Sequence, residues 1–118
     1  MITLDTTLAI DGAPLAADER FAGVHEASKL LKSLANESRL QILCLLCEGE
    51  LSVGELCSHI PLSQSALSQH LALLRAEGLV TTRRDAQFVL YSLASPEARA
   101  VIETLHGLFC SAEARAKG

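Results

Sequence analysis

Residues 50–93 read ELSVGELCSHIPLSQSALSQHLALLRAEGLVTTRRDAQFVLYSL, and this stretch decides the fold. It predicts a short helix over about 53–59, a tight turn at Ile60-Pro61-Leu62, a second helix, and two strands joined by a polar loop. Ser52 and Glu55 form a capping box, in which each side chain satisfies a free amide at the helix start. The proline in the turn cannot continue a helix. The order of elements is that of a helix-turn-helix followed by a wing.

The second helix of this stretch has the side chains of a DNA-reading helix. Ser63 caps it, and its apolar residues Ala66, Leu67, Leu71 and Leu74 recur at helical spacing, which predicts one buried stripe. Its first half carries uncharged hydrogen-bonding groups that match the donor and acceptor pattern of base edges in the major groove: Gln64, Ser65, Ser68, Gln69 and His70. The alternative is a polar face that only meets water. The adjoining turn and wing favour a recognition helix.

The predicted strands, 80–84 and 87–93, alternate apolar with polar or basic residues, as half-buried strands do. The loop between them would contact phosphate or a minor groove. The alternative is an ordinary hairpin with a hydrated tip. Together the two elements give ten predicted DNA-contacting residues: Ser63, Gln64, Ser65, Ser68, Gln69, His70, Arg75, Arg83, Arg84 and Gln87.

Helices are also predicted on both sides of this module. Residues 18–34 read as an amphipathic helix, 37–47 as a central apolar helix capped by Asn36, and 96–112 as a last helix with a wide apolar face. The expected fold is mainly α, with five helices and a small β-hairpin wing. Residues 18–112 form the winged helix-turn-helix domain, 1–17 a flexible arm and 113–118 a tail. We expect a homodimer through the N- and C-terminal helices; the alternative is a monomer with its last helix folded over its own core.

The composition agrees with a small regulator. A chain of 118 residues makes one domain, and no apolar run approaches the ~20 residues that span a bilayer. No signal peptide is recognisable, so we expect a cytoplasmic protein without a membrane partner, in which the four cysteines are not structural disulfides. The net charge of −4 argues against DNA binding. The acidic residues, however, are dense in the first 26 positions, whereas Arg75, Arg83 and Arg84 lie in the reading module.

Three segments carry a resemblance to a known family. LLKSLANESRLQILCLL at 30–46, the helix-turn-helix at 50–80 and RRDAQFVLYSL at 83–93 resemble the ArsR/SmtB family of winged-helix transcriptional repressors, over roughly 28–110. The resemblance implies a dimer, binding to double-stranded operator DNA, and release by an inducer. Metal-sensing members carry ELCVCDL where this chain has ELSVGEL, with Ser52 and Gly54 in place of the cysteines. His106, Glu103 and Glu97 lack the spacing of the C-terminal zinc site, so we expect no metal and no cofactor.

Cys44 and Cys110 are similar to the dithiol of the sulfide- and persulfide-responsive branch, the BigR, SqrR, YgaV and HlyU-like regulators. The resemblance implies that the two thiols lie close within a subunit and respond to reactive sulfur species or oxidants. They would form a disulfide or polysulfide link that lowers operator affinity. Without the resemblance, Cys44 between leucines is better explained as a small core residue.

Two other functions remain open on the residues alone. Cys44, Cys47, Cys57 and His59 supply four soft ligands for a zinc-responsive repressor, although the first two lie in an apolar helix. A thiol redox enzyme would place a C-x-x-C motif at a helix start beside a strand, whereas Cys44-x-x-Cys47 lies near a helix end. We therefore expect no enzyme activity.

Overall fold

The computed structural model describes residues 18–111. The predicted flexible arm (1–17), the tail (113–118) and Ala112 lie outside this range. Five helices and a small antiparallel sheet of three strands are present, which confirms the predicted winged helix-turn-helix. In chain order the elements are η2 (Glu19–Phe21), α1 (Val24–Leu34), α2 (Glu37–Glu48), β1 (Leu51–Ser52), α3 (Val53–His59), α4 (Gln64–Ala76), β2 (Val80–Asp85), β3 (Phe88–Leu93), α5 (Pro96–Leu105) and η3 (His106–Cys110).

The helix starts follow from side-chain caps that the sequence indicates. Asn36 Oδ1 accepts from the Arg39 amide at 3.0 Å, and Ser63 Oγ accepts from the Ala66 amide at 3.1 Å. At α3 both bonds of the capping box are made, at 3.2 Å to the Ser52 hydroxyl and 2.9 Å to the Glu55 carboxylate. These local bonds satisfy amides that have no partner inside the helix.

The two terminal helices are shorter than predicted. The helix expected over 18–34 begins only at Val24, because Gly23 takes a φ of 86° and separates η2 from α1. The last helix, expected over 96–112, is α-helical only to Leu105 and continues as the single π-helical turn η3. In that turn the Ser111 amide donates to the His106 carbonyl at 2.9 Å.

The sheet has the order β1-β3-β2, and both pairings are antiparallel. Thr82 of β2 pairs with Tyr91 of β3, which pairs on its other side with Leu51 of β1. Strand β1 is two residues long, and the sequence did not predict it. The wing turn between β2 and β3 contains Ala86 with a φ of 56°, which lies in the left-handed region.

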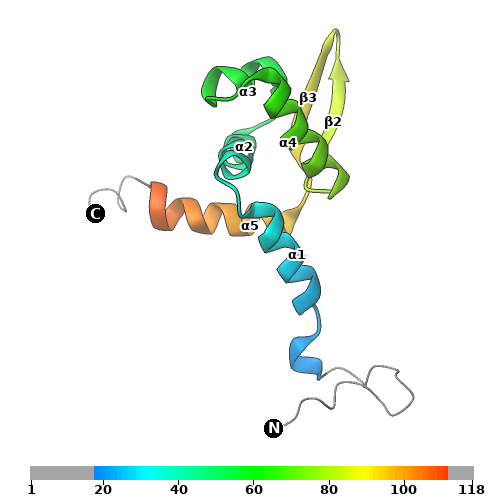
Figure 1. Ribbon diagram of the computed structural model, residues 1–118, viewed down its shortest axis with the longest axis vertical. Helices are drawn as coiled ribbons and strands as arrows, with labels where there is room; N and C mark the ends of the chain where they lie inside the picture. Colours follow the sequence, from blue (N-terminus) through cyan, green and yellow to red (C-terminus); the bar gives the residue numbers. More distant parts are fainter. Residues whose placement is uncertain (1–17, 112–118) are drawn as a thin grey trace.

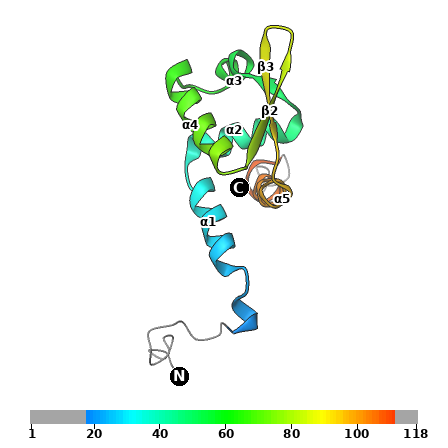
Figure 2. The same ribbon diagram turned by 90° about the vertical axis from the view of Figure 1, so that its right-hand side faces the viewer.

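The reading module and the wing lie at the opposite end of the molecule from α1 (Figures 1 and 2). Helix α2 packs against α5, and α3 against α4. Helix α1 extends away from the rest of the domain in both views. Within residues 18–111, no helix combines the length and apolar character needed to cross a membrane.

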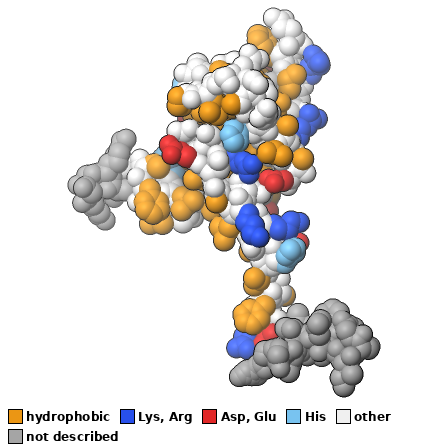
Figure 3. Space-filling model, viewed as in Figure 1, with side chains coloured by type: hydrophobic (Ala, Val, Ile, Leu, Met, Phe, Trp, Pro, Cys, Tyr) orange, Lys and Arg blue, Asp and Glu red, His pale blue; other side chains and the backbone are white. Residues whose placement is uncertain are grey.

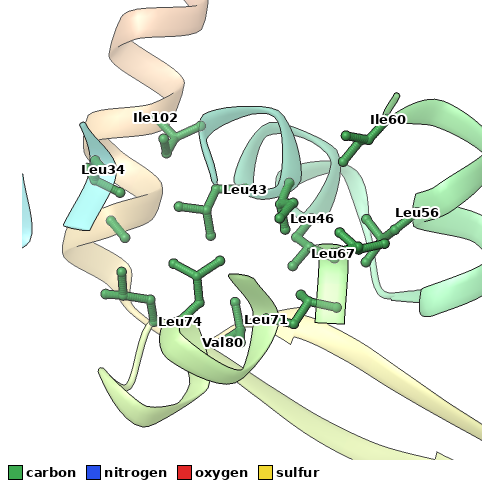
Figure 4. Close-up of a cluster of buried hydrophobic side chains, with 13 residues drawn as sticks. Leu34, Leu43, Leu46, Leu56, Ile60, Leu67, Leu71, Leu74, Val80 and Ile102 are labelled. Atoms are coloured by element: carbon green, nitrogen blue, oxygen red, sulfur yellow. The ribbon is translucent and has the colours of Figure 1, made fainter. Parts of the chain in front are cut away.

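One apolar core joins the elements (Figure 4). Leu43 and Leu46 of α2 lie among Leu67 and Leu71 of α4 and Ile102 of α5, and all five side chains are at most 1% exposed. The predicted central helix is therefore confirmed as the element around which the reading module and α5 assemble. Any movement of α2 against α5 must be accommodated by this shared core.

Leu71→Ala should lower the free energy of unfolding by about 2–5 kcal/mol, because Leu71 is fully buried and the shorter side chain leaves a cavity. Leu73→Ala is the matched control on the same helix, since Leu73 is 48% exposed and should change stability by no more than about 0.5 kcal/mol. Urea unfolding at one protein concentration measures both. Equal losses for the two variants would contradict the orientation of α4.

Candidate nucleic-acid interface and thiol pair

The rotation of α4 is fixed by three buried leucines, which turns its polar side chains outward. Leu67, Leu71 and Leu74 are 0% exposed. Four of the residues predicted to read bases face outward and are exposed: Gln64, Ser65, Ser68 and Gln69. Because α4 follows the short α3 and a turn, in which the Leu62 amide donates to the Ile60 carbonyl at 2.8 Å, it projects as the second helix of a helix-turn-helix.

Two further predicted DNA contacts, Ser63 just before α4 and His70 within it, differ from these four exposed side chains. Ser63 is exposed, but its hydroxyl caps the helix. His70 is half-buried, and its Nδ1 atom is buried without a hydrogen-bond partner among residues 18–111. Arg75 is exposed in the last turn of α4.

The wing carries basic side chains along its edge (Figure 3). Arg83 and Arg84 are exposed on β2, and Gln87 is exposed in the turn. Arg83 is paired within the chain: its Nε lies 2.9 and 3.1 Å from the two carboxylate oxygens of Glu50, and its terminal nitrogen donates to the same carboxylate. Sequence reasoning missed Glu50, because nothing near it in the chain signals a partner on a later strand.

The two predicted sensing thiols lie on α2 and on η3, and residues of both elements line one cavity. Cys44 is half-buried on α2, and Cys110 is exposed at the end of η3. Burial raises the pKa of the Cys44 thiol, and the neighbouring Cys110 and Cys47 raise it further. Cys44 also lines a cavity of about 290 Å³ between α2 and α5, whose wall includes His106.

Cys47 lines the same cavity but lies beside another part of α5. Burial raises the pKa of its thiol, Arg99 lowers it, and Glu103 raises it. Arg99 also donates to the Cys47 carbonyl at 3.1 Å, which ties the end of α2 to the start of α5. Cys47 therefore lies along α5, between Arg99 in its first turn and Glu103 in its last.

The four ligands of the zinc hypothesis do not form a site. Within residues 18–111 there is no group of three or more histidine, cysteine, aspartate or glutamate side chains arranged to hold a metal ion. Cys44 and Cys47 face α5, whereas Cys57 and His59 belong to α3. The physical reason is that the apolar helix α2 turns its thiols toward another helix instead of toward α3.

Cys44 and Cys110, the two thiols predicted to sense sulfur, should react with alkylating agents at different rates. In proteins that keep one cysteine and carry serine at the other three, iodoacetamide at pH 8 should modify Cys110 faster, because Cys110 is exposed and Cys44 is half-buried. Burial, the largest cause of the raised pKa of Cys44, persists in the single-cysteine protein and should shift its alkylation to higher pH than in the same protein unfolded in urea. Identical pH profiles for Cys44 in folded and unfolded protein would contradict this environment.

Large apolar side chains remain exposed on the terminal helices. On the N-terminal side Phe21 is 63% and Leu31 is 59% exposed, and on the C-terminal side Leu108 is 63% and Phe109 is 70% exposed. Figure 3 shows apolar side chains gathered over both regions. The apolar stripe predicted for the last helix is thus buried at Ala98 and Ile102 and uncovered toward the end of η3. Uncovered apolar surface of this kind marks interaction sites.

A helix-turn-helix whose second helix exposes uncharged polar groups, followed by a basic hairpin, defines a winged-helix DNA-binding protein. Comparison with known proteins then gives the family. A family model described as bacterial regulatory protein, arsR family, matches residues 36–82. The chain belongs to the ArsR family and is a DNA-binding transcriptional regulator, not an enzyme.

Relatives of known name match this chain over most of its length. The transcriptional activator HlyU of Vibrio cholerae serotype O1 is 57% identical over 103 residues, covering 87% of this chain and 95% of the relative. The biofilm growth-associated repressor of Agrobacterium fabrum is 44% identical over 110 residues, covering 93% and 92%. The solved structure of reduced HlyU from Vibrio cholerae N16961 superimposes with a TM-score of 0.75 at 58% identity, covering 80% of this chain and all of that one.

Proposed function

We propose that the protein is a homodimeric repressor that binds operator DNA in its reduced form and releases it when Cys44 and Cys110 become linked. The inducer is a reactive sulfur species or an oxidant. The observation that supports the proposal is that the half-buried Cys44 of α2 lines a cavity together with His106 and Gly107 of η3, the turn that ends at the exposed Cys110.

The chemistry of the link is thiol exchange and needs no cofactor. With an organic trisulfide, RSSSR, the Cys110 thiolate attacks the central sulfur and expels RS⁻, which leaves Cys110–S–S–S–R. The Cys44 thiolate then attacks the middle sulfur of that chain and expels a second RS⁻, so the protein holds a trisulfide. Two protein thiols are oxidised and the organic trisulfide is reduced to two thiols. Attack on the Cys110 sulfur itself would instead give a disulfide and release RSS⁻.

The link would couple the core of the reading module to the C-terminal helix. Cys44 belongs to α2, whose Leu43 and Leu46 pack in the same core as the leucines of α4. Cys110 belongs to η3, which continues α5 toward the uncovered Leu108 and Phe109. Drawing η3 onto α2 therefore displaces the C-terminal surface relative to α4.

A dimer turns this displacement into a change of DNA affinity. The apolar faces of α1 and of the C-terminal helix support pairing with a second copy, which would bury them. Two recognition helices then read half-sites about 34 Å apart on a pseudo-palindromic operator. The link would change the separation of the two recognition helices that the dimer prefers. A resulting change of about 1–3 kcal/mol in the free energy of DNA binding is enough to alter promoter occupancy.

Selection from a pool of random duplexes tests the proposal. The reduced protein should enrich a pseudo-palindrome, and analytical ultracentrifugation should show one duplex bound by two copies. The enriched duplex should be released by organic trisulfide, with peroxide and a simple disulfide as parallel treatments that identify the inducer class. A bound duplex that none of the three treatments releases would contradict the proposed switch.

A further inference from the structure

The ion pair between Glu50 and Arg83 is unlike the other ion pairs in residues 18–111. Asp18 with Arg20 and Arg99 with Glu103 each join neighbours within a turn, whereas Glu50 and Arg83 lie 33 positions apart in the chain. Glu50 directly precedes β1 and the start of α3, and Arg83 lies on β2 of the wing. The ion pair therefore links the helix-turn-helix to the wing.

The sheet register explains how the two side chains meet. Arg83 pairs with Leu90 of β3, and Leu90 pairs on its other side with Ser52 of β1. Glu50 lies immediately before β1, next to Leu51, which pairs with Tyr91 of β3. The carboxylate and the guanidinium thus come together across the middle strand, on one face of the wing.

The contact occupies one hydrogen-bonding edge of the guanidinium, the edge formed by Nε and a terminal nitrogen, which could otherwise bind a phosphate. Arg83 donates through Nε and through a terminal nitrogen to both oxygens of Glu50, which is the bidentate geometry that arginine uses for phosphate. The pair keeps both groups charged: Arg83 lowers the pKa of the Glu50 carboxyl, and Glu50 raises that of Arg83. Arg84, the next residue, has no ion-pair partner in the described part of the chain.

We propose that Glu50 is a positioning residue that holds Arg83 in the wing and withholds its charge from DNA, so that Arg84 supplies the phosphate contact of β2. When the protein binds DNA, Glu50 and Arg83 together carry no net charge. Glu50 therefore limits the affinity of a chain whose net charge already disfavours DNA. This inference rests on the DNA-binding module and does not depend on the proposed thiol switch.

The salt dependence of binding to a random-sequence duplex tests this role, because each phosphate contact contributes about −0.9 to the slope of log affinity against log salt. The reduced full-length protein is titrated by fluorescence anisotropy. Glu50→Gln should steepen the slope by about 0.9 and bind about fivefold more tightly at 0.15 M salt, since it frees one contact. Arg84→Gln should make the slope shallower by about 0.9.

Two further variants separate the proposal from a merely structural role of the pair. The double variant Glu50→Gln/Arg83→Gln should keep the wild-type slope, because the neutral pair contributes no phosphate contact in the wild type. Arg83→Gln alone leaves the Glu50 carboxylate uncompensated and should weaken binding, and the double variant should restore wild-type affinity. A slope of the double variant that is shallower by as much as in Arg84→Gln would overturn the proposal. So would a folded Glu50→Gln protein that binds no more tightly than wild type.

Discussion

A Cys110→Ser protein is expected to keep its operator affinity after treatment with organic trisulfide, whereas the same treatment should lower the affinity of the wild type about 5- to 150-fold. The serine hydroxyl cannot attack a sulfur chain at neutral pH, so no link to Cys44 can form and η3 stays free of α2. Since Cys110 is exposed, its replacement removes no core contact, and the reduced variant should bind DNA as the wild type does. Fluorescence anisotropy before and after treatment measures the difference.

Cys57→Ser is the matched control for this result. Cys57 is a half-buried thiol on α3, outside the cavity that Cys44 lines, so its loss should leave the wild-type response intact. Cys44→Ser should behave like Cys110→Ser. If Cys110→Ser and wild type lose the operator to the same extent, another thiol carries the response and the proposed pair is wrong.

Gln69→Ala should weaken binding to the selected operator by about 1–3 kcal/mol, or about 5- to 150-fold, and should leave binding to random duplex almost unchanged. The side chain is exposed on α4 and caps no helix, so its removal should cost little stability. Its amide can both donate to and accept from a base edge, and such contacts specify sequence instead of adding general affinity. Anisotropy titrations with both duplexes give the ratio of the two affinities.

Arg84→Gln provides the contrast, because loss of a phosphate contact should weaken both duplexes by a similar factor. A Gln69→Ala protein that loses operator and random duplex equally would show that Gln69 does not read bases. The polar face of α4 would then be a hydrated surface, which is the alternative left open by its composition.

Most of the fold could be predicted because its signals are local. Caps at Asn36, Ser52 and Ser63 predict the starts of three helices, and all three helices are present. Periodic leucines likewise predicted which face of α4 is buried. The errors lie where distant contacts or unusual backbone decide the outcome.

Four features show where the sequence-based predictions fail. Strand β1 is only two residues long and exists because β3 pairs with it. The break at Gly23 and the π-helical turn of η3 interrupt segments whose apolar periodicity suggested continuous helices. The ion pair between Glu50 and Arg83 depends on the sheet register, which no local pattern reveals.

The DNA-binding face and the thiol pair also differ in how far the sequence alone predicts them. The exposed polar face of α4 follows from periodicity, so its residues could be named in advance. The pairing of Cys44 with Cys110 is still a prediction that only the family resemblance suggested, because periodicity places each on its own helix and does not dictate the contact between helices. The packing of α2 on α5 supplies the missing step.

Peptide mapping of the trisulfide-treated wild type by mass spectrometry tests the sulfur link most directly. The expected product is a single chain in which the peptides containing Cys44 and Cys110 are joined, with one sulfur added and two hydrogens lost for a trisulfide, or two hydrogens lost for a disulfide. Cys47 and Cys57 should remain free thiols. Joined peptides from two different chains, or a link that omits either Cys44 or Cys110, would contradict a switch that works by tying α2 to η3.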